Sequence, residues 1–157
     1  MTAADRVPPS PEATAERREE VAAVLDRVVS MARVWPDISA VALCGPWAGG
    51  RADMGADVEL CMVVRWRSDL AKDPGWLAGQ IAVGARFLGR QDRGRLRTDM
   101  RYQLRSGLEV EVALVDRSWA AADPPDAATA AVVCTGFIAL HDPKALLAAL
   151  RDAVDDA

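Results

Sequence analysis

The sequence has little of the chemistry on which many enzymes and most secreted proteins depend. Histidine occurs once, as His141, and cysteine occurs three times, as Cys44, Cys61 and Cys134. The cysteines are odd in number, far apart and set among apolar residues, which predicts reduced core thiols and argues against a disulfide framework or a zinc site. His141 stands beside Asp142 with no serine or cysteine pattern around it. We interpret it as a surface or capping residue and not as a catalyst.

Long apolar runs are also missing. The longest charge-free run, Ala127 to Leu140, is shorter than the roughly 20 residues that a membrane-spanning helix needs. No basic start followed by an apolar block indicates a signal peptide. The formal net charge of −4 predicts no general attraction to nucleic acid or to an anionic membrane surface. We therefore expect a cytoplasmic protein without a membrane partner.

What is present is typical of one globular domain. Of the 157 residues, 51% are hydrophobic and 27% are charged, and this length is enough to bury one core. Residues 1–10 are polar and proline-rich, which predicts a disordered tail. We therefore place a single domain at 11–157. No internal repeat is visible.

Periodicity and capping residues predict the elements of the N-terminal half. The segment Ser10–Glu12 has the features of a helix start, and apolar residues recur at helical spacing from there to about Val34. Short apolar runs at 38–44 and 57–64 predict strands. A second helix is expected to open at Asp73. Its expected buried side consists of Trp76, Leu77, Ile81, Phe87 and Leu88.

The C-terminal half predicts sheet again and then helix. The runs 99–104 and 108–115 flank a glycine turn and alternate as the arms of a hairpin do. A short helix over 127–133, a last strand over 136–142 and a terminal helix from Pro143 complete the chain. The fold class that follows is α/β or α+β, with a mixed sheet of four to five strands flanked by helices.

Aromatic residues are few, with five tryptophans, two phenylalanines and one tyrosine. We expect Trp35, Trp66 and Trp119 to be packing residues. Trp47 lies inside a glycine-rich turn, where it either stacks on a base or anchors the loop in the core, and the second is favoured.

One stretch, CGPWAGGRADMGADVEL at 44–60, points to chemistry. Glycines crowd a turn after the first strand, and Asp57 and Glu59 follow on the second with one residue between them, so their side chains share a face. Glu109 and Glu111 share a face of the hairpin in the same way. If these faces coincide, three or four carboxylates meet within a few ångströms. Such a cluster needs hydrogen bonds or a cation to stay ionised.

This combination suits phosphoryl or nucleotidyl transfer. Carboxylate oxygens are ligands that Mg²⁺ prefers, together with substrate phosphates. Backbone N–H groups at a glycine turn can hold a phosphate, because glycine lets the backbone approach closely. Two metal ions can then clamp the attacking and leaving oxygens. Each feature alone is more often structural, since acids alternating with valines are also typical of a half-exposed strand.

The order of these features resembles the nucleotidyltransferases of the polymerase β superfamily, especially their small bacterial and antibiotic-modifying members. The motif of that family runs Gly-Ser-x-Ala-x-Gly and later Ser-Asp-x-Asp-Leu. The segment 136–143 is also similar to the Gly-x-x-Leu-Tyr-Asp-Pro segment that closes the core in many members, so the resemblance covers about residues 20–155. The matching motif positions are Gly45, Ala48, Gly50, Asp57, Glu59 and Leu60.

The resemblance implies a Mg²⁺-dependent transfer of a nucleoside monophosphate from a nucleoside triphosphate to an acceptor. It implies that Asp57, Glu59 and Glu111 are the catalytic acids and the ligands of one or two Mg²⁺ ions, with Glu109 as the alternative third acid. The nucleotide-binding residues that it implies are Gly45, Pro46, Gly50 and Arg51.

Three positions depart from the family pattern. Pro46 replaces the motif serine and removes both a hydroxyl and a backbone N–H, Ala56 replaces the serine before the first acid, and Glu59 stands where aspartate is usual. Two alternatives therefore stay open beside an active transferase. One is a catalytically inactive nucleotide-binding or regulatory member of the same fold, and the other is an interaction domain without a ligand.

The acceptor is left open between a small molecule, a protein and RNA. Because the chain has little beyond a minimal core, we expect a homodimer or a separate helical partner to complete the acceptor site. A cluster of arginines either grips a nucleotide or an RNA end or forms a solvated surface, and the second is favoured. Its members are Arg86, Arg90, Arg93, Arg95, Arg97, Arg101 and Arg105.

Overall fold

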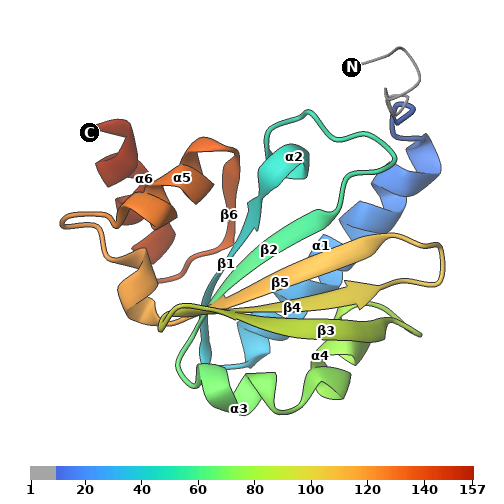
Figure 1. Cartoon of the computed structure of the whole chain (residues 1–157), viewed down its shortest axis with the longest axis horizontal. Helices are drawn as coiled ribbons and strands as arrows, with labels where there is room; N and C mark the ends of the chain where they lie inside the picture. The colour runs from blue at the N-terminus through green and yellow to red at the C-terminus, as the bar shows by residue number, and fades with distance from the viewer. Residues whose placement is uncertain (1–9) are drawn as a thin grey trace, which may run out of the picture.

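The computed structural model describes residues 10–157, which form a six-stranded mixed sheet flanked by helices (Figure 1). The predicted fold class is confirmed, although six strands replace the expected four to five. The predicted tail lies, except for Ser10, outside the described residues. The elements are α1 (Ala15–Val34), β1 (Ile38–Cys44), α2 (Gly45–Ala48), β2 (Val58–Val64), α3 (Arg67–Ala71), α4 (Pro74–Ile81), β3 (Arg86–Arg93), β4 (Arg97–Gln103), β5 (Glu109–Val115), the 3-10 helix η2 (Arg117–Ala120), α5 (Ala127–Cys134), β6 (Phe137–His141) and α6 (Leu146–Asp155).

The strand order is β3-β4-β5-β2-β1-β6. Strands β2 and β5 run parallel, and the other neighbouring pairs run antiparallel. The parallel pair sets Glu59 directly beside Glu111. The antiparallel pair β4/β5 sets Arg101 opposite Glu111. The acid-bearing strands are therefore next to each other in the middle of the sheet.

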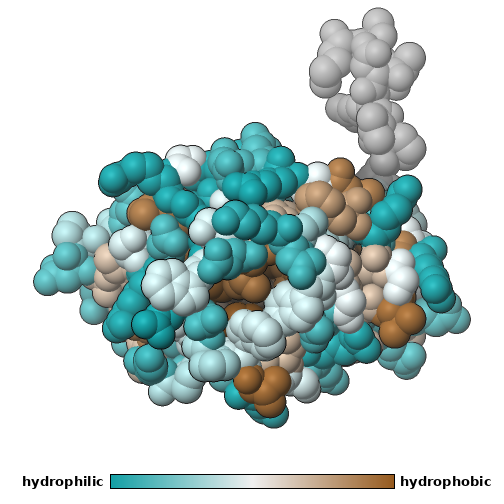
Figure 2. Space-filling view, turned by 90° about the horizontal axis from the view of Figure 1, so that it is seen from below, coloured by the Kyte–Doolittle hydropathy of each residue, from teal (hydrophilic) through white to brown (hydrophobic). Residues whose placement is uncertain are grey.

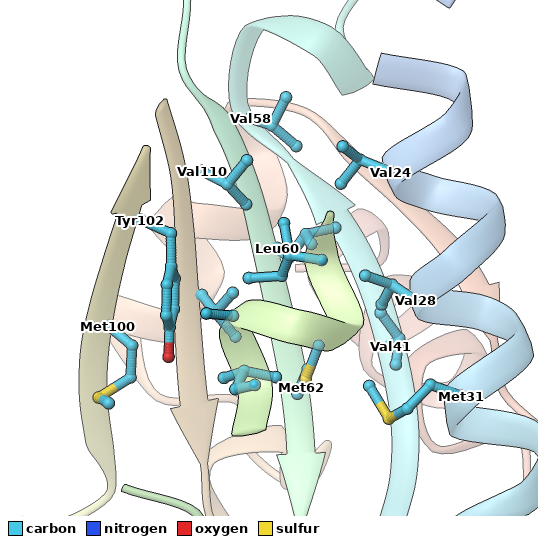
Figure 3. Close-up of a cluster of buried hydrophobic side chains, with 14 of the residues drawn as sticks. Val24, Val28, Met31, Val41, Val58, Leu60, Met62, Met100, Tyr102 and Val110 are labelled. Atoms are coloured by element: carbon cyan, nitrogen blue, oxygen red, sulfur yellow. The ribbon is translucent and has the colours of Figure 1, made fainter. Parts of the chain in front are cut away.

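The two faces of the sheet are covered unequally. Helices α1 and α4 pack on the first face, where Val24 and Val28 of α1 meet Leu60 and Met62 of β2 (Figure 3). On the second face η2, α5 and α6 cover β1, β6 and part of β2 and β5, against a smaller apolar cluster that includes Cys61. In the part of the chain that the structure describes, no helix covers the second face of β3 and β4. The side chains that β2 and β5 direct to the second face are thus buried at one end and open at the other.

The first helix starts later than predicted. Thr14 is its N-cap, and the Thr14 hydroxyl accepts the N–H of Arg17 at 3.1 Å. The segment at Pro11 and Glu12 pairs instead with the loop before β2, because the N–H of Met54 donates to the Pro11 carbonyl at 2.9 Å. The prediction of a helix start at Ser10 was therefore wrong, because the residues after Ser10 form a long-range backbone contact instead of the first helical turn.

The second helix ends at Ile81, so Phe87 and Leu88 were wrongly assigned to it. Both belong to β3, an edge strand whose residues are almost all exposed. An exposed edge strand has no apolar alternation, and this removes the signal by which a strand is predicted. The terminal helix also begins later, at Leu146 instead of Pro143, where the Asp142 carboxylate accepts two of its first N–H groups.

The rest of the predicted C-terminal order is confirmed, with the hairpin β4/β5, the helix α5 and the strand β6 in place. Cys44 and Cys61 are buried as predicted, but Cys134 is exposed. Within residues 10–157 no helix has both the length and the hydrophobicity to cross a bilayer.

The tryptophans divide into two groups. Trp119 is buried, and Trp47 packs against the main core while its indole N–H donates to the Ala56 carbonyl at 3.1 Å, so both predictions are confirmed. Trp35 is 39% exposed but packs its ring on Trp76, whereas the packing role was wrong for Trp66, which is 52% exposed.

Truncating the centre of the sheet should be costly. Leu60 is 2% exposed between α1 and the sheet, and Leu60→Ala should lower the free energy of unfolding by about 2–5 kcal/mol, because it removes buried methyl groups and leaves a cavity. Leu88→Ala on the exposed edge strand is the control and should stay within about 0.5 kcal/mol. Urea denaturation measures both, and equal losses would contradict the core described here.

Candidate active site

The acids predicted from the sequence do meet on one face of the sheet. Asp57 lies directly before β2, and Glu59 and Glu111 are neighbours across the parallel pair β2/β5. All of them lie on the second face, at the end that the C-terminal helices leave open. Glu109 lies on the same face of β5, two residues before Glu111. The condition set by the sequence, that the faces coincide, is met.

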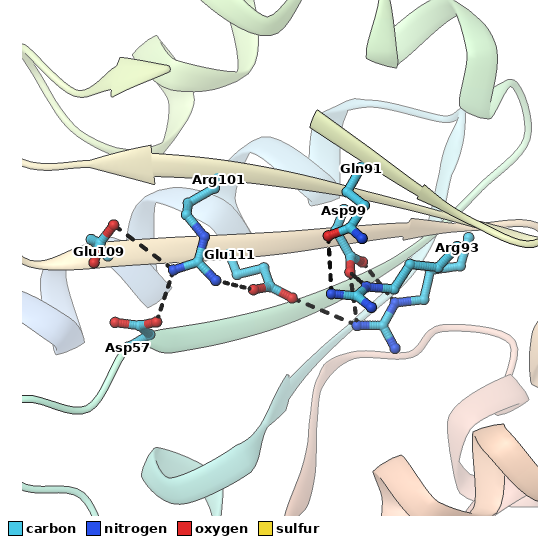
Figure 4. A network of polar contacts seen from close by, with 8 residues as sticks. Asp57, Gln91, Arg93, Asp99, Arg101, Glu109 and Glu111 are labelled. Carbon is cyan, nitrogen blue, oxygen red and sulfur yellow. Dashed lines mark hydrogen bonds and ion pairs between the residues drawn. The ribbon is translucent and has the colours of Figure 1, made fainter. Parts of the chain in front are cut away.

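Arg101 stands in the middle of these acids (Figure 4). Its Nη1 is 3.1 Å from Asp57 Oδ2, and its Nη2 is 2.8 Å from Glu111 Oε2. Nη1 is also 3.8 Å from Glu109 Oε1. One guanidinium therefore neutralises part of the like-charge cluster that the sequence predicted. Crowded carboxylates need a cation to stay ionised, and here the Arg101 side chain provides it.

A second guanidinium approaches the cluster from β4. Arg97 Nε donates to Asp99 Oδ1 at 2.7 Å, and Arg97 Nη2 is 3.6 Å from Glu111 Oε1. Glu111 thus lies between Arg97 and Arg101, with its side chain 16% exposed. Ion pairs in such a half-buried setting are screened less than surface pairs. Glu111 is the most firmly held acid of the group.

Glu59 differs from the other acids because none of the ion pairs within residues 10–157 includes it. Burial raises the pKa of its carboxyl above the ordinary value, and the negative charges of Glu111 and Asp57 raise it further. A carboxyl that binds its proton more tightly than usual, next to other carboxylates, is a common feature of functional sites.

The glycine turn is shaped to receive Glu59. Gly45 has φ of +69°, and a Cβ on Gly45 would lie 1.6 Å from Glu59 Oε2, so the carboxylate occupies the space of the missing side chain. The turn is closed from the other side by β6, where the N–H of Gly45 donates to the Gly136 carbonyl at 3.1 Å. Glycine at position 45 therefore serves both the backbone and the neighbouring acid.

The four residues expected to bind the nucleotide lie on this turn, next to the acids. Gly45 and Pro46 begin α2, and Gly50 follows it with φ of +69°. Arg51 is directed to the end of α5, where its Nη2 donates to the carbonyl of the C-cap residue Thr135 at 2.6 Å. Their contact with a nucleotide stays a prediction.

The acids fit Mg²⁺ by donor type, since carboxylate oxygens are its usual protein ligands. Their arrangement is not ready-made: within residues 10–157 no group of three or more histidine, cysteine, aspartate or glutamate side chains is placed to hold a metal. The space between Asp57 and Glu111 is taken by the Arg101 guanidinium. Mg²⁺ coordination by Asp57, Glu59 and Glu111 would require Arg101 to swing out, which its position on an uncovered sheet face allows.

Two hollows adjoin the acids. One of about 230 Å³ extends over β3 and β4 and is lined by the guanidinium-bearing Arg90, Arg93 and Arg101 together with Glu111. The other, of about 60 Å³, lies inward and is lined by Cys44, Glu59, Arg97 and Glu111 among others. Burial, with the charge of Glu59, raises the pKa of the Cys44 thiol to about 12, so this cysteine is not a thiolate nucleophile.

The sequence pattern predicted that Arg97 and Arg101 belong to a solvated arginine cluster, but both lie among the acids. It gave no indication that Asp99 pairs with Arg97. A usable signal existed in the register of the hairpin. Counting back from the turn at Gly107 places Arg101 opposite Glu111, and opposite charges in such a pair attract.

No family model and no curated protein matches this chain. Among solved structures, a cytoplasmic RNA terminal U-transferase has a TM-score of 0.48 at 18% identity, covering 66% of this chain and 31% of the other. The Cid1 poly(U) polymerase with Mg and 3'-dATP bound gives 0.49 at 18% identity, covering 66% and 32%. Cid1 with the UTP analogue UMPNPP gives 0.44 at 18% identity, covering 67% and 32%. The chain thus spans about a third of these proteins, and similarity at this level says nothing about its own reaction.

A single methyl group at position 45 should test the contact between the glycine turn and Glu59. Gly45→Ala adds backbone strain of about 1–2 kcal/mol at positive φ and also displaces the carboxylate. Gly50→Ala is a matched control, because Gly50 has the same φ of +69° and no atom within 4 Å of its added Cβ. Gly45→Ala should destabilise more in urea denaturation. The excess should disappear in a Glu59→Ala background, and persistence of the excess there would contradict the contact.

The raised pKa of Glu59 predicts a pH-dependent stability. The folded state binds the Glu59 proton more tightly than the unfolded chain, so the contribution of this group to stability falls as pH rises from about the ordinary pKa of 4.5 through the raised pKa. Glu59→Gln removes the titration and should stabilise the protein at neutral pH, with no difference in acid. Glu19→Gln on the exposed side of α1 is the control. Urea denaturation at several pH values would refute this if Glu59→Gln were destabilising at neutral pH.

Proposed function

We propose that this chain is a Mg²⁺-dependent nucleotidyltransferase, which transfers a nucleoside monophosphate from a nucleoside triphosphate to an acceptor. The observation that carries the proposal is the convergence of Asp57, Glu59 and Glu111 on one uncovered sheet face beside the Gly45 turn. A plain sheet surface has no need to collect four carboxylates beside a turn whose glycine makes room for one of them.

In this reaction a hydroxyl oxygen of the acceptor forms a bond to the α-phosphorus, and the bond between that phosphorus and the oxygen bridging to the β-phosphate breaks. Pyrophosphate leaves, and the hydroxyl proton is released. Mg²⁺ held by the three acids would neutralise charge on the phosphates and orient them. The hollow over β3 and β4 lies next to the acids and is lined by three arginines, Arg90, Arg93 and Arg101, against two acids, Asp99 and Glu111, so that an anionic part of either substrate could pair with an arginine there.

Arg101 has two roles in this proposal. In the free protein it lies between Asp57 and Glu111 and offsets their repulsion. With Mg²⁺ and nucleotide bound, Asp57 and Glu111 would hold the ion, and the Arg101 guanidinium would be free to pair with a phosphate. Mg²⁺ alone competes directly with Arg101 and should bind weakly, whereas Mg²⁺ with a nucleotide supplies a new partner for the displaced arginine.

Nucleotide binding without turnover is the second candidate. Pro46 at the start of α2 has no N–H to offer a phosphate, and the ion pairs of Arg101 oppose assembly of the metal site. We also propose that the acceptor is a small molecule, a protein or RNA. A homodimer or a separate helical partner would complete the acceptor site. A cytoplasmic location stays a prediction.

Metal and nucleotide responses of two variants test the site without knowledge of the acceptor. With wild-type protein, nucleoside triphosphate plus Mg²⁺ or Mn²⁺ should raise the melting temperature more than either alone, by the equivalent of about 2.7 kcal/mol at one hundred times Kd. Asp57→Asn should abolish this response. Arg101→Met should create a response to Mg²⁺ alone, because Asp57 and Glu109 then lack a cationic partner and Glu111 keeps only Arg97.

Asp152→Asn on the exposed side of α6 controls for the loss of one charge. Incorporation of label from an α-phosphate-labelled triphosphate into candidate acceptors distinguishes a transferase from a silent nucleotide-binding protein. An Asp57→Asn variant that still responds fully to nucleotide and metal would overturn the assignment of the site. A wild-type protein that responds to no nucleotide and no divalent ion would favour the interaction domain.

A further inference from the structure

A hollow lies at the end of the sheet opposite to the acids. Its walls are three tryptophans contributed by separate segments, and its volume is about 220 Å³. Trp35 follows α1, Trp66 follows β2, and Trp76 belongs to α4. Figure 2 views the molecule from the end at which α3 lies, and it shows a recess with a hydrophobic floor between residues of intermediate hydropathy. The exposure of Trp35 and Trp66 therefore belongs to a formed cavity and not to two isolated side chains.

Two of the three aromatic rings are in contact, and the third lines the same hollow. The ring centroids of Trp35 and Trp76 are 4.7 Å apart with their planes at 42°, so these two rings form a corner. Trp66 stands on a different segment and faces the hollow together with Leu70. Large aromatic side chains are mostly buried in folded proteins. Three of them around an open cavity therefore leave apolar area that a ligand can cover.

Three aspartates line the same hollow, and no basic residue does within the described range 10–157: these are Asp37, Asp69 and Asp73. No ion pair among residues 10–157 involves them. Asp73 accepts the N–H of Trp76 at 3.1 Å, which fixes one carboxylate beside the ring corner. The cavity therefore combines aromatic faces with unneutralised negative charge.

A cation already lies on one of these rings. The Arg65 guanidinium carbon is 5.1 Å from the centroid of Trp66, within the range of a cation–π contact. Arg65 does not line the hollow. The contact shows that a positive group can pack on the Trp66 ring, and three carboxylates line the same hollow as this ring.

We propose that this cage, formed by Trp35, Trp66 and Trp76 with its three aspartates, binds a small organic cation of the quaternary or alkylated ammonium class. Aromatic faces attract such cations through the ring quadrupole, and carboxylates complete the charge. An anion or a neutral apolar ligand would leave the aspartates uncompensated. The volume of about 220 Å³ is below the roughly 300–1,000 Å³ of drug-sized ligands, which fits a head group.

This site is separate from the candidate active site. Asp57 stands before the first residue of β2 and Trp66 comes after its last, so the length of the strand, roughly 20 Å, lies between them. The inference does not depend on the proposed nucleotidyltransferase activity. Failure of one would leave the other standing.

The test uses the full chain with choline, with tetramethylammonium and with the uncharged carbon isostere of choline, in which a tert-butyl group replaces the trimethylammonium group. Calorimetry and tryptophan fluorescence should show millimolar or tighter binding of both cations. The isostere should bind about tenfold more weakly, because it fills the same volume without the charge.

Variants assign the binding to the cage. Trp66→Leu should weaken choline about tenfold, Trp66→Phe should retain most of the affinity, and Asp69→Asn should weaken it several-fold. Asp152→Asn on α6 should bind as wild type does. Trp66 and Asp69 are exposed, so these variants are expected to fold, which near-ultraviolet circular dichroism checks.

Two binding results, and one result without binding, would overturn the proposal. One is equal affinity for choline and its uncharged isostere, which would make the hollow a plain apolar pocket. The other is a folded Trp66→Leu protein that binds choline as tightly as wild type. Absence of any cation binding, with Trp66-dependent self-association in sedimentation, would likewise overturn it and assign the tryptophans to contact with a second copy of the chain.

Discussion

Repulsion between carboxylates on a half-covered sheet face is the constraint on which the candidate active site depends. Glu59 and Glu111 lie side by side on parallel strands, and Asp57 and Glu109 stand near them. Water reaches one end of this face but not the other, so the charges are neither fully screened nor fully buried. The Arg101 guanidinium offsets this repulsion at the open end. At the inner end, burial raises the pKa of Glu59, and the negative charges of Glu111 and Asp57 raise it further.

The unequal cover of the sheet creates this situation. Helices α1 and α4 close the first face with a large apolar core, whereas η2, α5 and α6 close only part of the second. Strands β2 and β5 therefore carry apolar residues where the helices lie and acids where they do not. The glycine turn meets this boundary. Gly45 makes room for the Glu59 carboxylate, and β6 holds the turn in place through the carbonyl of Gly136.

Local sequence patterns predicted much of this arrangement. Alternation along β2 and β5 correctly gave the acids that share a face, because side-chain direction in a strand repeats every second residue. The glycine turn, the hairpin and the last strand were likewise recognisable from a few neighbouring residues. Failures occurred where the local pattern was uninformative, as on the exposed edge strand β3. They also occurred where a distant segment intervened, as at Pro11, whose carbonyl binds the N–H of Met54.

The sequence by itself determined which acids could act together, since the two-residue period of a strand is a local property of the backbone. Only the tertiary structure decided that β2 and β5 pair in parallel, that Arg101 stands among the acids and that Trp35, Trp66 and Trp76 surround a hollow. Each of these depends on contacts between residues far apart in the chain. A local pattern shows which way a side chain points and how apolar its surroundings should be. What stands opposite to it is set by the packing of the whole sheet.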